Sequence, residues 1–154
     1  MFVGAAENPF ADPFEIRVMR LAKKIEAGAE FIQTQSVFNV DKFEEWIKQA
    51  RDQGLTEKVY IMAGITPLKS AGMARYMKNK VPGMEIPDEV LKRMTDTPKE
   101  KQADEGINIC IETIQRLKEC KGISGFHIMS IEWEAKVAEI VRRAGLYPRP
   151  TPGL

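Results

Sequence analysis

One glutamine in this sequence stands where a ring-shaped ligand could be recognised. Gln35 comes near the end of the run FIQTQSVF (31–38), which is typical of a strand. A carboxamide offers one acceptor and two donors, and this combination suits a planar heterocycle that presents both. A glutamine here also has a purely structural use, because most buried amides bond to backbone groups. The pattern alone leaves both interpretations open.

Charged residues at the ends of two other predicted elements are further candidates for ligand binding. Lys23 and Lys24 close the first predicted helix and lie away from its apolar face. Lysines at such a place stabilise a helix through its dipole, and the same pair suits a bound phosphate. Glu7 is the carboxylate at the end of the first predicted strand. We expect it either to orient a ligand or to be solvated.

The other reactive side chains have structural explanations. His127 is the single histidine, predicted on the strand face opposite Phe126 and Ile128, and no second ligand stands at metal-binding distance in the sequence. Cys110 and Cys120 fall on one predicted helix, about 15 Å apart along its axis, which is too far for a disulfide. Cys110 is expected in the core. No Gly-rich nucleotide loop, CxxC pair or nucleophile elbow occurs, so the residues predict no catalytic set and no metal site.

Four strand–helix units are predicted to position these residues. Strands are expected from Phe2 into GAAENPF and at residues 31–38, 59–65 and 125–131. Asp41 with Glu44, and Thr97 with Pro98 and Glu100, have the spacing of capped helix starts. Helices are accordingly expected at 14–27, 41–53, 69–79, after Pro87, at 97–120 and at 133–144.

Alternating strands and helices predict a parallel sheet with right-handed crossovers. Two architectures fit this pattern: an open doubly wound sheet, or half of an eight-stranded (βα) barrel. The first strand begins at residue 2 without a lead-in, which favours the half-barrel, because a complete barrel needs about 250 residues. We therefore expect a half-barrel over residues 1–147, with extra helices before the last strand. A Pro-rich tail is expected at 148–154.

Composition excludes several classes of partner. The 154 residues are 44% hydrophobic and 29% charged, with 23 basic and 22 acidic side chains and a net charge of +1. This balance is typical of one globular domain and offers no field that would attract nucleic acid. No apolar run approaches the ~20 residues of a membrane span, and the start MFVGAAENPF lacks the pattern of a secretory signal. A cytoplasmic protein is expected.

Several stretches resemble the methylenetetrahydrofolate reductase family of flavin-dependent (βα)8 barrels. AGAEFIQTQSVFNVDKFEEW (27–46) is similar to the "DAGA…ITQ…FD" segment of that family. GAAENPF (4–10) resembles its fifth-strand turn, and AGITPL (63–68) resembles its seventh strand. GFHIMSI (125–131) and AGLYPRP (144–150) are similar to its eighth strand and closing segment. The resemblance covers nearly the whole chain and corresponds to the C-terminal half of the family barrel.

The resemblance implies an oxidoreductase of one-carbon metabolism that uses FAD to pass a hydride from a nicotinamide cofactor to methylenetetrahydrofolate, giving methyltetrahydrofolate. Gln35 matches the family glutamine that contacts the folate pterin and the nicotinamide cofactor. Lys24 matches a family lysine, and Lys23 stands at a position where the family usually has an arginine. Both family residues help to hold the diphosphate and ribityl region of FAD. Glu7 takes the place of a flavin-contacting tyrosine and is a further candidate for cofactor binding.

Other positions depart from the family pattern. Arg17 and Arg20 replace polar or acidic flavin contacts, Met73 replaces a folate-binding glutamine, and Trp133 replaces an arginine that meets the folate tail. These changes suggest altered flavin and folate arrangements, as in divergent reductases of anaerobes that work with partner subunits. Helical spacing also explains Trp133 and Met73 as plain packing residues.

The catalytic acid of the family and many flavin contacts belong to the first four barrel strands, which have no counterpart in this chain. We therefore expect a fragment, split or truncated reductase that is inactive alone and pairs with a complementary N-terminal half, a partner subunit or a second copy. The main alternative is a non-catalytic half-barrel that serves as an interaction subunit. A third possibility is a folate-binding methyl carrier or methyltransferase-type barrel without flavin.

Overall fold

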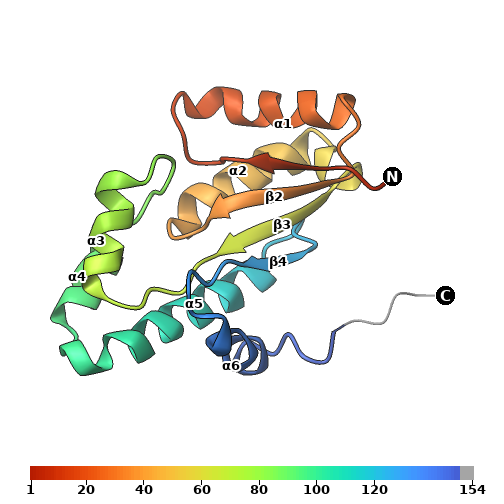
Figure 1. Ribbon diagram of the computed structural model, residues 1–154. Helices are drawn as coiled ribbons and strands as arrows, with labels where there is room; N and C mark the ends of the chain where they lie inside the picture. Colours follow the sequence, from red (N-terminus) through yellow and green to blue (C-terminus); the bar gives the residue numbers. More distant parts are fainter. Residues whose placement is uncertain (150–154) are drawn as a thin grey trace.

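A parallel four-stranded sheet forms the centre of the protein (Figure 1). The computed structural model describes residues 1–149. The strands follow one another across the sheet in the order β1-β2-β3-β4, and every neighbouring pair is parallel. They are β1 (Gly4–Glu7), β2 (Phe31–Ser36), β3 (Tyr60–Ile65) and β4 (Gly125–Ile128).

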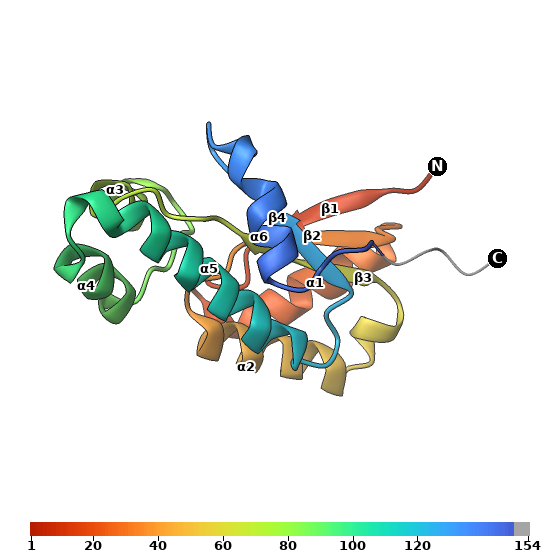
Figure 2. The same cartoon turned by 90° about the horizontal axis from the view of Figure 1, so that it is seen from below.

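Helices cover one face of this sheet, and Figure 2 shows α1, α2 and α5 together on that side. One core joins α1, α2, α5 and α6 to the sheet, with Phe43, Trp46 and Ile61 fully buried in it. These helices are α1 (Arg17–Glu26), α2 (Val40–Asp52), α5 (Gln102–Lys118) and α6 (Val137–Arg143). Short 3-10 segments lie at Phe14–Ile16, Leu55–Glu57, Lys99–Lys101 and Glu134–Lys136.

The second face of the sheet is open. Along β2, Ile32, Thr34 and Ser36 are buried toward the helices, whereas the residues between them are half-exposed. Phe2 and Tyr60 on the open side are each 61% exposed. We call this second side the open face. In a complete (βα)8 barrel the corresponding face lines the interior.

The strand order decides between the two predicted architectures. A doubly wound sheet reverses its strand order at a switch point and carries helices on both faces. Here the order does not reverse, and α1, α2, α5 and α6 share one core with the sheet. The expected half-barrel is therefore confirmed, and the doubly wound alternative is wrong.

A second, smaller core lies beyond the carboxyl ends of the strands. α3 (Ala71–Lys80) and α4 (Asp88–Asp96) form a hairpin there, drawn in green in Figure 1. Met77, Ile86 and Met94 are buried and pack with Ile109 of α5. We call α3, α4 and their connection the helical lobe. It contains the extra helix expected before the last strand.

The strands are shorter than the apolar runs predicted. Phe2 precedes β1, Val37 and Phe38 follow β2, and residues 129–131 follow β4. β1 and β4 each have a single neighbour, and each pairs with it over four residues. The apolar sequence continues past the paired residues of β2 because the next two side chains are also buried. Val37 packs in the main core, and Phe38 packs in the core of the lobe.

The predicted cap of the second helix is wrong. Asn39 caps α2, and its side chain accepts a hydrogen bond from Lys42 N at 3.0 Å. Asp41 lies inside the first turn and pairs instead with Arg116 of α5, at 2.5 Å. Asparagine and aspartate are equally good caps, so the sequence offered two candidates two residues apart.

The long helix before β4 begins later than predicted. Thr97 ends α4, and its hydroxyl donates to Arg93 O at 2.9 Å. A 3-10 turn then precedes α5, which begins at Gln102. The side-chain oxygen of Gln102 accepts from Ala71 N at 2.9 Å and so ties α5 to the start of α3.

Two simpler expectations concern cysteines and membranes. Both cysteines, Cys110 and Cys120, are free, as their spacing predicted. No helix within residues 1–149 is long and apolar enough to cross a membrane. Most of the predicted Pro-rich tail lies outside the described residues.

α5 passes so close to the segment before α3 that a side chain does not fit at Gly106, where a Cβ would lie 1.7 Å from Leu68 O. We predict that Gly106→Ala lowers the free energy of unfolding by about 1–3 kcal/mol through overpacking. The matched control is Gly72→Ala in α3, where the new methyl group would meet Ser70 Oγ at 3.6 Å. That change should be neutral or should stabilise the protein by about 0.5–1 kcal/mol. Urea unfolding compares the variants, and equal midpoints would contradict the prediction.

Candidate functional site

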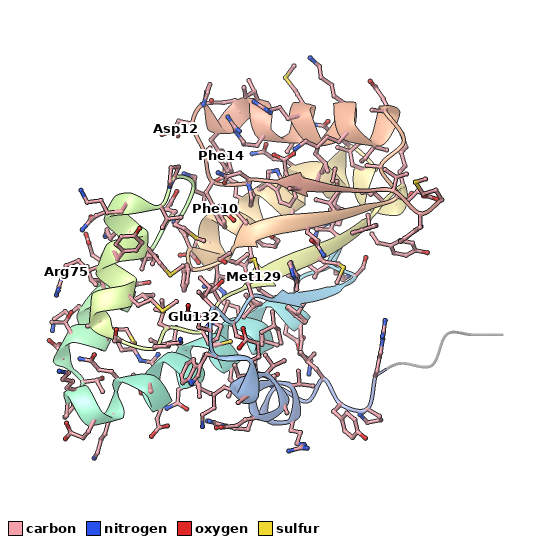
Figure 3. The ribbon with its side chains drawn as sticks, in the orientation of Figure 1. Phe10, Asp12, Phe14, Arg75, Met129 and Glu132 are labelled. Atoms are coloured by element: carbon pink, nitrogen blue, oxygen red, sulfur yellow. The ribbon has the colours of Figure 1, made fainter. Side chains whose placement is uncertain are left out.

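A hollow opens at the carboxyl ends of the strands, where (βα)8 barrels carry their active sites. Its volume is about 390 Å³, in the range of small-ligand pockets. Figure 3 shows this end of the sheet, where Phe10 and Asp12 follow β1 and Met129 follows β4. The hollow is lined by Ala6, Glu7, Asn8, Arg17, Arg20, Lys24, Gln33, Thr34, Gln35, His127 and Met129.

A β-bulge interrupts the pairing of β2 with β3 beside this hollow. Gln33 pairs with Met62 but Ser36 pairs with Gly64, so β2 carries one residue more than β3 in this stretch. The Thr34 hydroxyl spans the irregularity: it accepts from Gly64 N at 3.0 Å and donates to Gln35 O at 3.0 Å. Bulges are common next to active sites, where they redirect a side chain.

Gly64 permits the close approach of the two strands at the bulge. A Cβ at this position would lie 2.4 Å from Thr34 O and 2.9 Å from Gln35 O. Gly64 also pairs with His127 of β4. Since Gly64 has no side chain, β3 can lie directly against the bulged backbone of β2 while it pairs with β4 on its other side.

Two carboxamides reach the hollow without partners of their own. Gln33 and Gln35 both line it, and neither side chain forms a hydrogen bond within residues 1–149. Both residues are half-buried, so their donors and acceptors remain accessible to a ligand. The sequence identified Gln35 but not Gln33, although residues two apart on a strand share a face and the pattern QTQ therefore predicts the pair.

Glu7 and Lys24 form an ion pair at the edge of the hollow. Lys24 Nζ lies 2.5 Å from Glu7 Oε2 and donates to Ala6 O at 2.6 Å. The side chain of Glu7 is 1% exposed and that of Lys24 is 29% exposed. The second carboxylate oxygen accepts from Asn8 N at 3.1 Å. The sequence analysis considered Glu7 and Lys24 as separate candidates for ligand binding, and the structure shows that they form one ion pair.

Further cations surround Lys24 on α1. Arg17, Arg20 and Lys24 have the spacing of one helix face, and all three line the hollow. The buried side chain of Arg17 donates to two carbonyl oxygens of the loop before α1, at 3.0 and 3.3 Å. Lys23 does not line this hollow but an adjoining one, next to Arg20 and Lys24. The carboxyl end of β1 therefore faces a stripe of positive charge.

His127 lies on the face that alternation predicted, opposite Phe126 and Ile128, which pack against the main core. It lines the hollow, a placement that the strand pattern alone did not predict. Its Nδ1 is buried and has no hydrogen-bond partner within the described part of the chain. No cluster of His, Cys, Asp or Glu side chains suited to a metal ion occurs among residues 1–149.

Three other residues considered in the sequence analysis, Cys110, Trp133 and Met73, do not line the hollow. Burial raises the pKa of the Cys110 thiol to about 12, which keeps it a neutral core residue rather than a nucleophile. Trp133 packs against the main core. Met73 belongs to the helical lobe, where its sulfur accepts from Lys69 N at 3.4 Å.

Comparison with known proteins identifies the family to which this arrangement belongs. The family model for methylenetetrahydrofolate reductase matches residues 6–145, from the end of β1 through α6. The chain belongs to the methylenetetrahydrofolate reductase family. The matched range contains every residue that lines the hollow.

Individual reductases of the family are similar along most of this chain. A probable methylenetetrahydrofolate reductase (NADPH) of Caenorhabditis elegans is 27% identical over 151 residues, or 94% of this chain and 22% of the relative. Methylenetetrahydrofolate reductase 2 of Saccharomyces cerevisiae is 30% identical over 83% of this chain and 21% of the relative. The chain thus spans about a fifth of the length of these curated relatives.

A solved structure has the same fold. It is an uncharacterized protein from Clostridium thermocellum that binds two copies of 5-methyl-5,6,7,8-tetrahydrofolic acid. The TM-score is 0.70 and the sequence identity is 16%, with 94% of this chain and 52% of the other covered. The strand order and the coverage of about half of that chain agree with a half-barrel.

The bulge of this reductase-family sheet depends on one hydroxyl. We predict that Thr34→Val lowers the free energy of unfolding by about 1–3 kcal/mol, because the buried Gly64 N–H loses its acceptor while the volume stays nearly constant. Thr113→Val is the matched control, because the Thr113 hydroxyl makes no side-chain hydrogen bond within residues 1–149. Urea denaturation measures both variants. Equal losses would mean that the Thr34 hydroxyl does not hold the bulge.

Proposed function

We propose that this chain supplies the carboxyl-terminal half of the folate and flavin site of a methylenetetrahydrofolate reductase, and that it is inactive alone. The observation that carries the proposal is the Gln35 carboxamide, which lines the hollow and has no hydrogen-bond partner within residues 1–149. One acceptor and two donors suit the edge of a pterin ring. Gln33 adds a second carboxamide to the same wall.

The cations of α1 fit the diphosphate of FAD. Arg20 and Lys24 meet both the main hollow and the adjoining one that Lys23 lines. Lysine and arginine side chains form charge-assisted hydrogen bonds with phosphate oxygens. Bound FAD would carry the hydride from a nicotinamide cofactor to 5,10-methylenetetrahydrofolate, giving 5-methyltetrahydrofolate. The chain's own contribution is to bind the phosphates and to orient the rings.

In this proposal Glu7 acts through Lys24 rather than by touching a phosphate. A carboxylate would repel the diphosphate, but its bond to Nζ at 2.5 Å fixes the ammonium group at the end of β1. An ammonium group has three donors. Two of them meet Glu7 and Ala6, which leaves one for a ligand oxygen.

The absence of a free carboxylic acid among the described residues that line the hollow supports the expectation that the chain alone is inactive. Among the described residues that line the hollow, Glu7 is the one carboxylate, and Lys24 already holds it. Reduction of the folate carbon also needs a proton donor. We propose that the donor belongs to the first four strand–helix units of a complete barrel.

The open face supports pairing with such a second body. β1 and β4 are sheet edges, and unpaired edges of a parallel sheet readily add strands. At the amino end, Phe2 stacks on Phe31 with ring centroids 5.2 Å apart, and Tyr60 lies 6.3 Å from Phe2. This exposed aromatic cluster also favours the second candidate function, a half-barrel that dimerises without catalysis.

We predict that Gln35→Ala raises the dissociation constant for 5-methyltetrahydrofolate about tenfold, the equivalent of one hydrogen bond of about 1.4 kcal/mol. Gln53→Ala, in the exposed cap after α2, is the matched control and should leave the constant unchanged. Isothermal titration under anaerobic conditions makes the measurement. Equal affinities of the two variants would refute the assigned role of Gln35.

We also predict that the purified chain, given FAD, a reduced nicotinamide cofactor and methylenetetrahydrofolate, shows no turnover above the uncatalysed rate. The physical reason is that the described lining has no unpaired carboxylic acid and that half of the ring site is missing. Absorbance of the reduced cofactor follows the reaction, and light scattering gives the mass of the assembly. If the chain shows turnover and the Gln35→Ala variant does not, the prediction that the chain is inactive by itself is wrong. A stable dimer that binds neither flavin nor folate would favour the interaction subunit.

A further inference from the structure

A tight turn of the helical lobe touches the residues that face the hollow. α3 ends before Val81, and the turn Val81–Met84 closes with a hydrogen bond from Met84 N to Val81 O at 3.3 Å. Pro82 and Gly83 occupy its central positions, and Gly83 has φ +81°. Proline followed by a glycine with positive φ is the signature of a type II turn.

Gly83 lies against two side chains of the hollow. A Cβ on Gly83 would lie 2.4 Å from Asn8 Nδ2 and 3.4 Å from Gln35 Nε2. Asn8 and Gln35 line the hollow, whereas Gly83 does not. The turn is therefore a neighbour of these two carboxamides that does not itself line the hollow.

Glu85 attaches the same turn to the start of α2. Its carboxylate oxygens accept from Asn39 Nδ2 at 2.6 Å and from Lys42 Nζ at 2.7 Å. The next residue, Ile86, is 2% exposed and belongs to the small core of the lobe. The residues that directly follow the turn are thus fixed by an ion pair to α2 and by apolar packing in the small core of the lobe.

We propose that Gly83 is a positioning residue for ligand recognition: the turn Val81–Met84 holds the carboxamides of Asn8 and Gln35 toward the hollow. Glycine is needed twice, because the turn requires positive φ and because any side chain would displace Asn8. The helical lobe has a core of its own, apart from the main core, yet through this contact it fixes the orientation of the ring-binding amide. The inference rests on the proposed role of Gln35 and extends it to a segment remote in sequence.

Gly83→Ala tests the contact, and the chain offers a matched control. Gly54 also has positive φ, +66°, but nothing lies within 4 Å of a Cβ placed there. Gly54→Ala therefore has the same kind of backbone strain without the contact. The first readout is the side-chain amide signals of Asn8 and Gln35 in the NMR spectrum of the ¹⁵N-labelled chain. The second is the dissociation constant for 5-methyltetrahydrofolate.

We expect Gly83→Ala to shift or broaden both amide signals and to weaken binding about tenfold, while Gly54→Ala leaves signals and affinity as in the wild type. Glu85→Gln provides a second variant that adds no bulk and loosens the attachment to α2. It should move the same two signals, whereas Glu89→Gln, at an exposed position of α4, should not.

Two negative results have different meanings. If the signals of Asn8 and Gln35 stay unchanged in both Gly83→Ala and Glu85→Gln, the turn does not position them and the inference is overturned. If the wild-type chain shows no affinity for 5-methyltetrahydrofolate, the proposed function fails. The amide signals of the free chain still decide the role of Gly83 in that case, because they require no ligand.

Discussion

The bulge between β2 and β3 is the constraint on which the candidate site depends. β2 has one residue more than β3 where the two strands reach their carboxyl ends, and the Thr34 hydroxyl takes the place of a regular ladder bond. This arrangement requires glycine at position 64, since a Cβ would collide with two backbone oxygens of β2. The missing side chain thus lets β3 lie directly against the bulged backbone of β2, beside the strand end that carries Gln35.

Charge around the hollow follows from the way in which the first unit packs. α1 buries Val18 and Leu21 against the sheet, so the residues on its neighbouring face reach over the carboxyl end of β1. Of the cations there, Lys24 is neutralised by Glu7, and Arg17 is held by backbone carbonyls. Arg20 has no ion pair within residues 1–149. It is therefore the cation whose charge is least committed to the protein and most available to an anion.

Much of the fold and part of the site could be predicted from the sequence. The alternation of strand-like and helix-like segments predicted the number and order of the units, and the position of Gln35 near the end of a predicted strand marked it as a candidate for ligand binding. The ion pair of Glu7 with Lys24 could not be predicted, because it joins a strand end to a helix seventeen positions later across a distance that only the packing of α1 defines. Asn39 was not predicted as the N-cap of α2 because Asp41, two residues later, is an equally good capping residue by type. The contact of Gly83 with Asn8 and Gln35 depends on the placement of the lobe, which no local pattern encodes.

The open face has two chemically different ends, and this difference bears on what a completing body must provide. Its amino end carries the stacked rings of Phe2 and Phe31 with Tyr60 nearby, which offer apolar area but no recognition chemistry. Its carboxyl end carries carboxamides, an imidazole and cations, with one carboxylate that is already paired. A second body would gain its binding energy mainly at the amino end, because buried apolar area is the main source of association energy. In the proposed assembly, the second body would leave the polar groups at the carboxyl end free for ligand and would add an acid there. Association and chemistry would thus use opposite ends of the same face.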